Sequence, residues 1–281
     1  MKDQATETLN IIHAGYYVSS RGRTIDFAKE QAYSVSNTVL YSPQTLKNLR
    51  SAMLSSDQAK VSVQVQVQVQ EGTTQKIAHQ LSVAQTAPHQ SLVLLNFASA
   101  RHPGGGFLRG ARAQEEDLCR CSGLYPTLLT QPLYYKVNRE QSSMVYSDYT
   151  IYSPHVPFFR LDGREECLDK PIFPSVITMP APNTGPFLKK REGVLKDLEE
   201  PFFRRWCHVI AVAHHHQHSS LLVGAWGCGA FQGDPYLVAS MAKKAIKHGT
   251  GCINNIVFAI PNTGKQSRRN LSIFKEMMAS E

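Results

Sequence analysis

Residues 91–120 read SLVLLNFASARHPGGGFLRGARAQEEDLCR, and this stretch indicates the fold more directly than any other part of the chain. The apolar run from Leu92 to Phe97 has the length and composition of a buried strand. Three successive glycines follow Pro103. Each ordered glycine costs roughly 0.5–1 kcal/mol relative to alanine, so contact between this backbone and a ligand is a reasonable explanation for the run, and a flexible loop is the alternative.

Three more short apolar runs repeat the pattern further along the chain. They are Val176–Met179, Leu221–Val223 and Ile256–Ile260, with helical stretches between them. Strands that alternate with helices predict an α/β fold whose sheet is covered on both faces. In such a sheet, ligands bind at the carboxyl ends of the strands, where the glycine triplet falls.

The first sixty residues are mostly helical in pattern. Ser42 and Pro43 form an N-cap and first-turn pair for the helical sequence QTLKNLRSAML. The following segment, KVSVQVQVQVQEG, alternates strictly and predicts a strand with one solvent-facing side, with low complexity as the alternative. Its valines are Val61, Val63, Val65, Val67 and Val69.

A second glycine-rich loop, GAWGCGAFQGDP at residues 224–235, follows the Leu221–Val223 run. Its last two residues, Asp234 and Pro235, predict the start of a helix through Met241 and Ala245. Glycine N–H groups beside a helix N-terminus make a suitable cradle for a diphosphate, although such loops are often plain turns. The spacing matches neither a P-loop nor a dinucleotide-binding fingerprint, which disfavours nucleoside triphosphate hydrolysis and dinucleotide redox chemistry.

After seven intervening residues, the glycine triplet is followed by Gln114 and then by three carboxylates, Glu115, Glu116 and Asp117. Adjacent acids usually form a solvated surface. Here they follow a strand and a glycine loop on the sheet edge that also receives the second loop. The position of these acids at the ligand-binding edge of the sheet therefore favours a catalytic site that uses carboxylates.

The segment PGGGFLRGARAQEE resembles the signature of microbial-type poly(ADP-ribose) glycohydrolases, in which Gln-Glu-Glu follows a glycine triplet after six to eight residues. The resemblance covers most of the chain. It continues through NFASARHPGGG, YSPHVPFFR (152–160), MPAPNTG (179–185) and GAWGCGAF (224–231).

This resemblance implies a role for each residue of the motifs. Glu115 would hold hydroxyls of the ribose being released, together with Asn96, and Glu116 would protonate the leaving oxygen and then activate water. Phe231 would stack on adenine, although the following Gln232 departs from the Gly-Asn common in the family and leaves the details of the adenosine site open. The remaining substrate-binding residues, most of them around the diphosphate, would be Gly104, Gly105, Gly106, Gln114, Gly227, Cys228, Gly229 and Ala230.

Glycosidic cleavage needs a group that is protonated when the leaving oxygen departs. A carboxyl group in a dry pocket beside another carboxylate has a raised pKa, and this argument makes Glu116 the expected acid. The stereochemical outcome stays open.

The resemblance also implies a macrodomain-like mixed sheet flanked by helices. We expect an N-terminal helical extension over residues 1–60, packed on a catalytic core over residues 61–281. The expected function is hydrolysis of ribose–ribose bonds in poly(ADP-ribose), acting from the chain end. The alternatives are an ADP-ribose-binding module without turnover, which would not need Glu115 and Glu116, and a hydrolase of single ADP-ribose attachments.

The net charge of +8 favours anionic partners without identifying the anion. We expect poly(ADP-ribose) or ADP-ribosylated proteins as substrate, ADP-ribose as product, no specific DNA binding, and a monomer. The N-terminus has no signal peptide pattern and no apolar run is long enough to span a membrane, which predicts a soluble cytoplasmic protein. A secretion signal read by a dedicated apparatus would leave no trace that this argument detects.

We expect no cofactor and no metal. The run His214-His215-His216-Gln217-His218 invites a zinc interpretation, but consecutive histidines cannot all face one ion, and they fit the end of a helix. The six cysteines show neither disulfide density nor a CxxC pair. Cys119 and Cys121 lack a paired base and are expected to be buried thiols.

Overall fold

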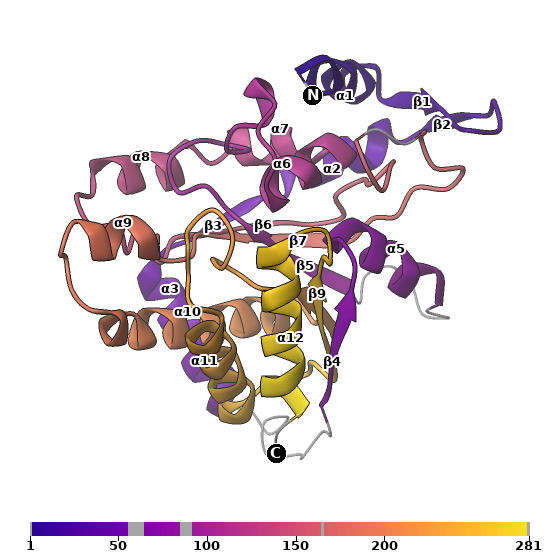
Figure 1. The fold of residues 1–281 in the computed structure, drawn as a ribbon. Helices are drawn as coiled ribbons and strands as arrows, with labels where there is room; N and C mark the ends of the chain where they lie inside the picture. The colour runs from indigo at the N-terminus through magenta and orange to yellow at the C-terminus, as the bar shows by residue number, and fades with distance from the viewer. Residues whose placement is uncertain (1, 56–64, 85–91, 164–165, 280–281) are drawn as a thin grey trace.

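A computed structural model describes residues 2–55, 65–84, 92–163 and 166–279 (Figure 1). Within these residues the main sheet has seven strands, in the order β3-β6-β7-β5-β8-β9-β4. The strands are β3 (Val39–Tyr41), β4 (Gln66–Glu71), β5 (Leu92–Phe97), β6 (Thr150–Ser153), β7 (Ser175–Met179), β8 (Ser220–Val223) and β9 (Asn255–Ile260). Neighbouring strands from β7 through β5, β8 and β9 to β4 are parallel, and β6 is antiparallel to both β3 and β7. The predicted α/β fold with a mixed sheet is confirmed.

Side chains of β5 alternate between two hydrophobic clusters on opposite faces of the sheet, as the two-residue period of a strand requires. Val93 and Leu95 belong to one cluster, and Leu92 and Leu94 to the other. All four are at most 1% exposed. A strand buried on both faces reads as a continuous apolar run, which is why the sequence showed it clearly.

Helices cover both faces, giving three layers (Figure 1). The cluster with Val93 and Leu95 is closed by α3 (Pro43–Ser55), α9 (Thr184–Lys189), α10 (Glu199–His215), α11 (Pro235–His248) and α12 (Lys265–Ala279). The opposite cluster is closed by α1 (Lys2–Ala14), α5 (Thr74–Ala84), α6 (Gln114–Cys121), α7 (Leu124–Leu129) and α8 (Pro132–Glu140). Two short 3-10 helices, η2 (Phe107–Arg109) and η3 (Leu195–Leu198), lie in the connections.

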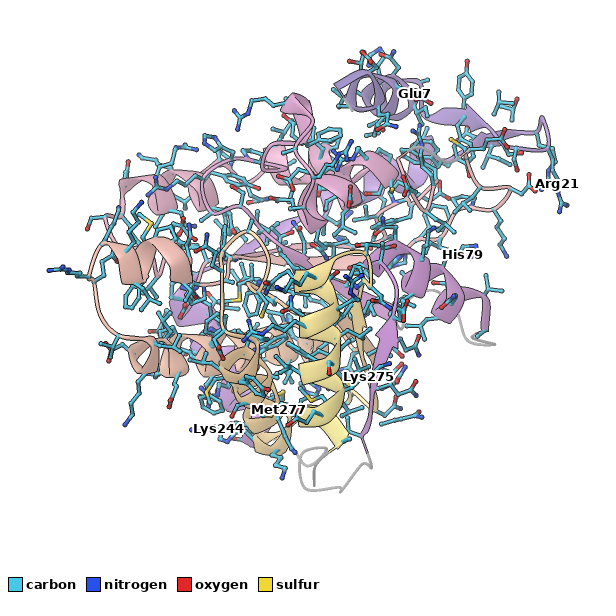
Figure 2. All side chains as sticks on the ribbon, viewed as in Figure 1. Glu7, Arg21, His79, Lys244, Lys275 and Met277 are labelled. Atoms are coloured by element: carbon cyan, nitrogen blue, oxygen red, sulfur yellow. The ribbon has the colours of Figure 1, made fainter. Side chains whose placement is uncertain are left out.

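The N-terminal region is mainly helical but also contributes strands. It contains α1, α2 (Ala28–Ser36), α3, the hairpin of β1 (Tyr16–Val18) and β2 (Thr24–Asp26), and the sheet strand β3. Helix α1 is held to the core by Arg160, 1% exposed, which donates to Glu7 at 3.1 Å, and by Thr8, which donates to the carbonyl of Arg120 (Figure 2). The expected boundary at residue 60 lies outside the described residues.

Two predicted helix starts are confirmed. Helix α3 begins at Pro43, and α11 begins at Pro235 with the Asp234 carboxylate accepting from the Leu237 N–H at 2.9 Å. The alternating valine segment forms β4 from Gln66, while Val61 and Val63 lie outside the described residues. No helix in the described part of the chain combines the length and apolar character needed to cross a bilayer.

Candidate active site

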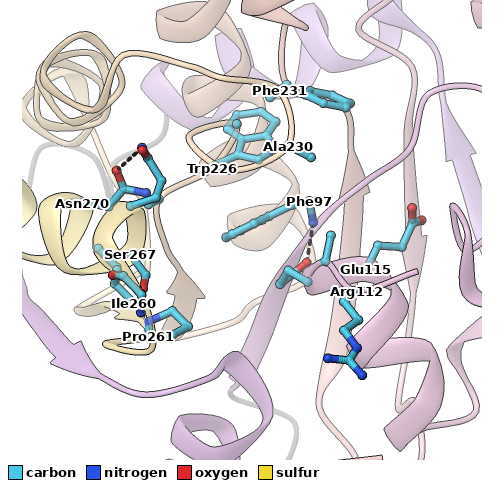
Figure 3. Close-up of a pocket in the computed structure, with 18 of the residues that line it drawn as sticks. Phe97, Arg112, Glu115, Trp226, Ala230, Phe231, Ile260, Pro261, Ser267 and Asn270 are labelled. Carbon is cyan, nitrogen blue, oxygen red and sulfur yellow. Dashed lines mark hydrogen bonds between the residues drawn. The ribbon is translucent and has the colours of Figure 1, made fainter. Parts of the chain in front are cut away.

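A cavity of about 670 Å³ opens at the carboxyl ends of the central strands (Figure 3). Strand β5 lies between β7 and β8 in the sheet. The chain continues from β5 to strands β6 and β7 on one side, and from β8 to β9 on the other side, so the connections diverge between β5 and β8. Such a switch leaves a crevice beyond the strand ends. Glu115 and Arg112 line one side of the cavity, and Asn270 and Ser267 line the other.

The two glutamates occupy the first turn of α6. Glu115 is 2% exposed and Glu116 is 8% exposed. Carboxylates at this end of a helix are stabilised by the unpaired N–H groups and the helix dipole. Asp117, the third acid, instead forms an ion pair with the buried Arg120 and does not line the cavity.

Glu115 is directed toward the end of β5. Its Oε2 accepts from the Ser99 N–H at 2.7 Å, and its Oε1 accepts from Asn96 Nδ2 at 3.2 Å. Burial, with a smaller contribution from the charge of Glu116, raises the pKa of Glu115 to about 8, although the bonds from Ser99 and Asn96 oppose the shift. This shift favours the protonated form of Glu115 in the ligand-free site. The enclosure that the sequence argument applied to Glu116 is most complete at Glu115.

Glu116 is held by the glycine triplet. Its Oε1 accepts from the Gly106 N–H at 2.8 Å. Gly105 has φ of +58°, and a Cβ at that position would lie 2.4 Å from Glu116 Oε1 and 3.1 Å from Glu115 Oε2. Only glycine combines this backbone conformation with such close approach of two carboxylates. The triplet therefore positions the acids, in addition to any contact with ligand.

Gln114 connects α6 to the central strand. Its Oε1 accepts from the Phe97 N–H at 2.8 Å, and its Nε2 donates to the Leu95 carbonyl at 2.8 Å and to Thr74 Oγ1 at 3.2 Å. These bonds occupy the amide within the protein. The Gln114 side chain borders the cavity, and its hydrogen bonds to β5 fix the position of the two glutamates that follow it.

The second glycine-rich loop forms the opposite rim. Gly227 has φ of +82° and packs against Ala181, while a Cβ at Gly229 would meet no atom within 4 Å. Phe231 lines the cavity and lies 6.2 Å from the ring of Tyr146. The Cys228 side chain is fully buried behind the loop, with burial raising the pKa of its thiol.

The structure therefore divides the predicted site residues into two groups. Those that line the cavity are Gln114, Glu115, Glu116, Gly227, Gly229, Ala230 and Phe231. Those that do not line it are Asn96, Gly104, Gly105, Gly106 and Cys228. Asn96 and Gly106 instead donate hydrogen bonds to the acids.

Sequence reasoning missed the C-terminal wall of the cavity. This wall runs from Ile260, at the end of β9, to Asn270 in α12. Gln266 and Asn270 donate to the carbonyl of Cys228, which joins the wall to the second loop. The signal was present, because the Ile256–Ile260 run is followed by Pro-Asn-Thr-Gly at the same sheet edge. Trp226, Arg112 and Ser99 were also missed as lining residues.

The histidine run at residues 214–218 lies outside this cavity, and so do Cys119, Cys121 and Cys252. His216 stacks on Tyr152 with ring centroids 3.5 Å apart, and His214 Nδ1 accepts from the Cys252 N–H. No group of three or more potential metal-ligating side chains occurs within the described ranges. Cys119 and Cys121 are buried, as predicted, and burial raises the pKa of both thiols.

The family model for the microbial-type PARG catalytic domain matches residues 5–161, more than half of the chain. The matched span contains the glycine triplet and both buried glutamates. The chain belongs to the microbial-type PARG family. The second glycine-rich loop and the C-terminal wall lie beyond the span matched by that model.

Solved PARG structures extend the similarity to these later segments. Poly(ADP-ribose) glycohydrolase from Thermomonospora curvata is 35% identical, with a TM-score of 0.89 and 98% of each chain covered. A structure from the same organism bound to the inhibitor ADP-HPD has a TM-score of 0.86, with 35% identity and 98% of each chain covered. The Deinococcus radiodurans PARG in complex with ADP-ribose is 37% identical, with a TM-score of 0.79 over 89% of this chain and 97% of that chain. Among curated proteins, no sequence matches this chain.

Proposed function

We propose that this protein hydrolyses the ribose–ribose O-glycosidic bonds of poly(ADP-ribose) and releases ADP-ribose. The observation that carries the proposal is a pair of buried glutamates at the wall of a cavity of about 670 Å³, in a chain of the microbial-type PARG family. A cavity of this volume suits a ligand of nucleotide size. Aromatic side chains and glycine backbone on the opposite rim suit a base and a diphosphate, respectively.

Glu116 is the proposed acid. As the glycosidic bond between the anomeric carbon and the leaving oxygen breaks, Glu116 transfers its proton to that oxygen. Water then adds to the anomeric carbon, and Glu116 takes up one of the protons of that water. Glu115, with Asn96 behind it, is the proposed acceptor for the ribose hydroxyls.

Burial, with a smaller contribution from the charge of Glu116, raises the pKa of Glu115, so the free site favours the protonated form of that carboxyl group. Ribose hydroxyls that donate to Glu115 would favour its ionised form. Asn96 Oδ1 is buried without a hydrogen-bond partner, and an amide flip would let it accept from protonated Glu115 in the free protein.

The test is release of ADP-ribose from purified poly(ADP-ribose) by the wild type and by Glu116→Gln, with ADP-ribose binding measured in parallel. We expect a loss of at least about 100-fold in release, because general acid catalysis contributes about 10²–10⁴-fold. Binding should be retained, since glutamine preserves the shape of the side chain and can accept from the Gly106 N–H. Glu276→Gln, on the exposed face of α12, is the matched control and should behave as wild type.

Other outcomes would remove the proposal. Binding without release by the wild type would indicate a reader of ADP-ribose. Equal cleavage of mono-modified and poly-modified proteins would defeat a preference for the polymer. Full activity in Glu116→Gln would remove this residue from the role of acid.

Action from the chain end is also proposed, and so is the setting in which the protein works. We propose a monomer inside the cell that has no specific affinity for DNA. The length distribution of early products separates action from the chain end from internal cleavage. Sedimentation of the purified protein measures its oligomeric state.

A further inference from the structure

The loop between the glycine triplet and α6 carries two exposed arginines, one of which lines the cavity with the acids. Leu108, Arg109 and Arg112 are exposed, and Arg112 lines the cavity together with Glu115 and Glu116. Among the described residues, neither arginine forms an ion pair with a carboxylate. Asp117, the acid that follows Glu115 and Glu116, is paired with Arg120.

This loop is held in one conformation by its own hydrogen bonds. The Ala111 N–H donates to the Gly106 carbonyl at 3.1 Å, and Arg109 N–H donates to the same carbonyl at 3.0 Å. Phe107 is fully buried and packs on Tyr125, with ring centroids 5.4 Å apart. From the core side, the buried Arg120 donates to the Ala111 carbonyl at 2.8 Å. The two exposed guanidinium groups therefore project from an ordered base, which reduces the entropy lost when they bind an anion.

Arg112 lies on the side of the site where the leaving group, the remaining polymer, is expected. The proposed acid, Glu116, stands where the leaving oxygen must be, and Arg112 is carried by the same wall. The proposed adenine contact of the released unit, Phe231, and the second glycine-rich loop lie on the opposite rim. In the polymer, the leaving oxygen belongs to the next ADP-ribose unit, which carries its own diphosphate a few bonds away. Guanidinium groups bind phosphate oxygens through paired, charge-assisted hydrogen bonds.

We infer that Arg112, assisted by Arg109, binds the diphosphate of the departing polymer unit and so makes the site selective for a polymeric leaving group. The inference rests on the proposed glycohydrolase function. It assigns to Arg112, on the wall of the cavity that carries the acids, a contact with the chain left behind rather than with the released ADP-ribose.

The test compares two substrates with Arg112→Ala, Arg112→Lys and the double variant Arg109→Ala/Arg112→Ala. One substrate is poly(ADP-ribose), and the other is ADP-ribose with an uncharged aryl group on the anomeric oxygen. For Arg112→Ala we expect kcat/KM on the polymer to fall about tenfold or more, as loss of a charge-assisted contact predicts. Hydrolysis of the aryl substrate and ADP-ribose binding should stay within about twofold of wild type.

Salt dependence and the conservative variant add readouts that a folding defect would not reproduce. The wild-type KM for polymer should rise with salt more steeply than that of the double variant. The double variant makes fewer phosphate contacts, so salt has fewer of them to screen. Arg112→Lys should restore part of the loss, since it keeps the charge without the planar fork. Arg21→Ala is the control, because it removes an exposed guanidinium from the β1–β2 hairpin, where Arg21 pairs with Asp169 outside the cavity lining (Figure 2 labels Arg21).

Equal losses on both substrates would show that Arg112 contacts the released ADP-ribose unit, and this would overturn the inference. Unchanged polymer kinetics in the double variant would overturn it as well. A wild type that binds ADP-ribose and cleaves neither substrate would instead refute the glycohydrolase function itself. The wild-type assay alone detects that failure, so it is distinguished from a failure of the inference about Arg112.

Discussion

At the scale of single residues, burial separates two glutamates that are adjacent in sequence. Successive helical positions point about 100° apart, so Glu115 turns to the end of β5 while Glu116 turns to the glycine triplet. Glu115 loses nearly all contact with water and receives the Ser99 and Asn96 hydrogen bonds. The two carboxyl groups thus have different environments, as the separate roles proposed for them require.

The raised pKa of Glu115 predicts a pH dependence of stability. The folded protein keeps this proton up to a pH of about 8, whereas the unfolded chain releases it near the ordinary value of 4.5. The folded state therefore binds more protons between these values, and the free energy of unfolding should fall as pH rises through this window. Glu115→Gln should flatten the dependence and be more stable than wild type at pH 8 by at least about 1 kcal/mol, since one pKa unit corresponds to about 1.4 kcal/mol.

Thermal unfolding at pH 5 and pH 8 measures this effect. Glu276→Gln, an exposed substitution of the same kind, should retain the wild-type difference between the two pH values. A Glu115→Gln variant with the wild-type pH slope would show that Glu115 is ionised in the folded protein.

At the scale of elements, the glycine triplet and α6 act as one unit. Gln114 fixes the start of α6 to β5, and Gly106 fixes Glu116 to the loop. The glycine loop therefore contributes first by allowing the acids to come close. Contact between the backbone of the glycine triplet and a diphosphate remains a prediction.

Gly105→Ala tests the unit. The new Cβ would meet Glu116 Oε1 at 2.4 Å, and the φ of +58° disfavours alanine. We expect ADP-ribose release to fall about 100-fold, because a displacement of about 1 Å in a catalytic group has that order of effect. The left-handed backbone should also cost about 1–2 kcal/mol of stability.

Gly22→Ala separates the backbone effect from the displacement of the acid. Gly22 has φ of +73° in the exposed turn of the β1–β2 hairpin, and a Cβ there would meet no atom within 4 Å. It should lose stability alone, measured by chemical denaturation, and keep full release activity. Equal activity in both variants would contradict a positioning role for the triplet.

At the scale of the whole molecule, Asp148 and Arg205 join helix α10 to the segments that follow α8 and β7. Arg205 is fully buried and donates to Asp148 at 2.8 Å and to the carbonyls of Val145, Tyr146 and Pro180. Tyr146 lies beside Phe231. One buried guanidinium therefore connects the helical layer to the rim of the cavity.

Asp148→Asn should destabilise the protein by about 3–5 kcal/mol, because it leaves a buried guanidinium without its counterion. Burial alone would raise the pKa of Asp148, but the hydrogen bonds and charges of Arg204 and Arg205 outweigh it and lower the pKa to about 2. Since the folded pKa lies below the ordinary 3.8, this contribution is present above pH 4 and is lost as pH falls toward 2. Chemical denaturation at pH 7 and pH 3 measures both effects.

Asp169→Asn is the control for this pair. Asp169 forms its ion pairs with Arg21 and Arg23 at the surface, where solvent screens them, and little change is expected. A similarly small effect at Asp148 would show that the buried network contributes little to stability.

The sequence by itself determined five strands of the main sheet (β4, β5, β7, β8 and β9), the two glycine loops and the acids, but it did not reveal β3, β6 or the β1–β2 hairpin. Leu92–Phe97 is buried on both faces and therefore reads as an apolar run, and Asp234-Pro235 marks a helix start through local hydrogen bonding. The signature with Glu115 and Glu116 is contiguous, so its resemblance to a family was visible without a structure. Signals of this kind depend on neighbours in the chain, which is why sequence reasoning could find them.

Only the tertiary structure decided which of these residues face the cavity. It placed Glu115 deeper than Glu116, turned Cys228 into the core, engaged the Gln114 amide with β5 and brought the wall formed by residues 260–270 across from the acids. These outcomes depend on the direction of each side chain and on contacts between separate elements, which join Gln114 to Phe97 over 17 residues and bring residues 260–270 to the acids from much farther along the chain. Burial and hydrogen-bond partners are set by those contacts, so they exist only once the layers have packed.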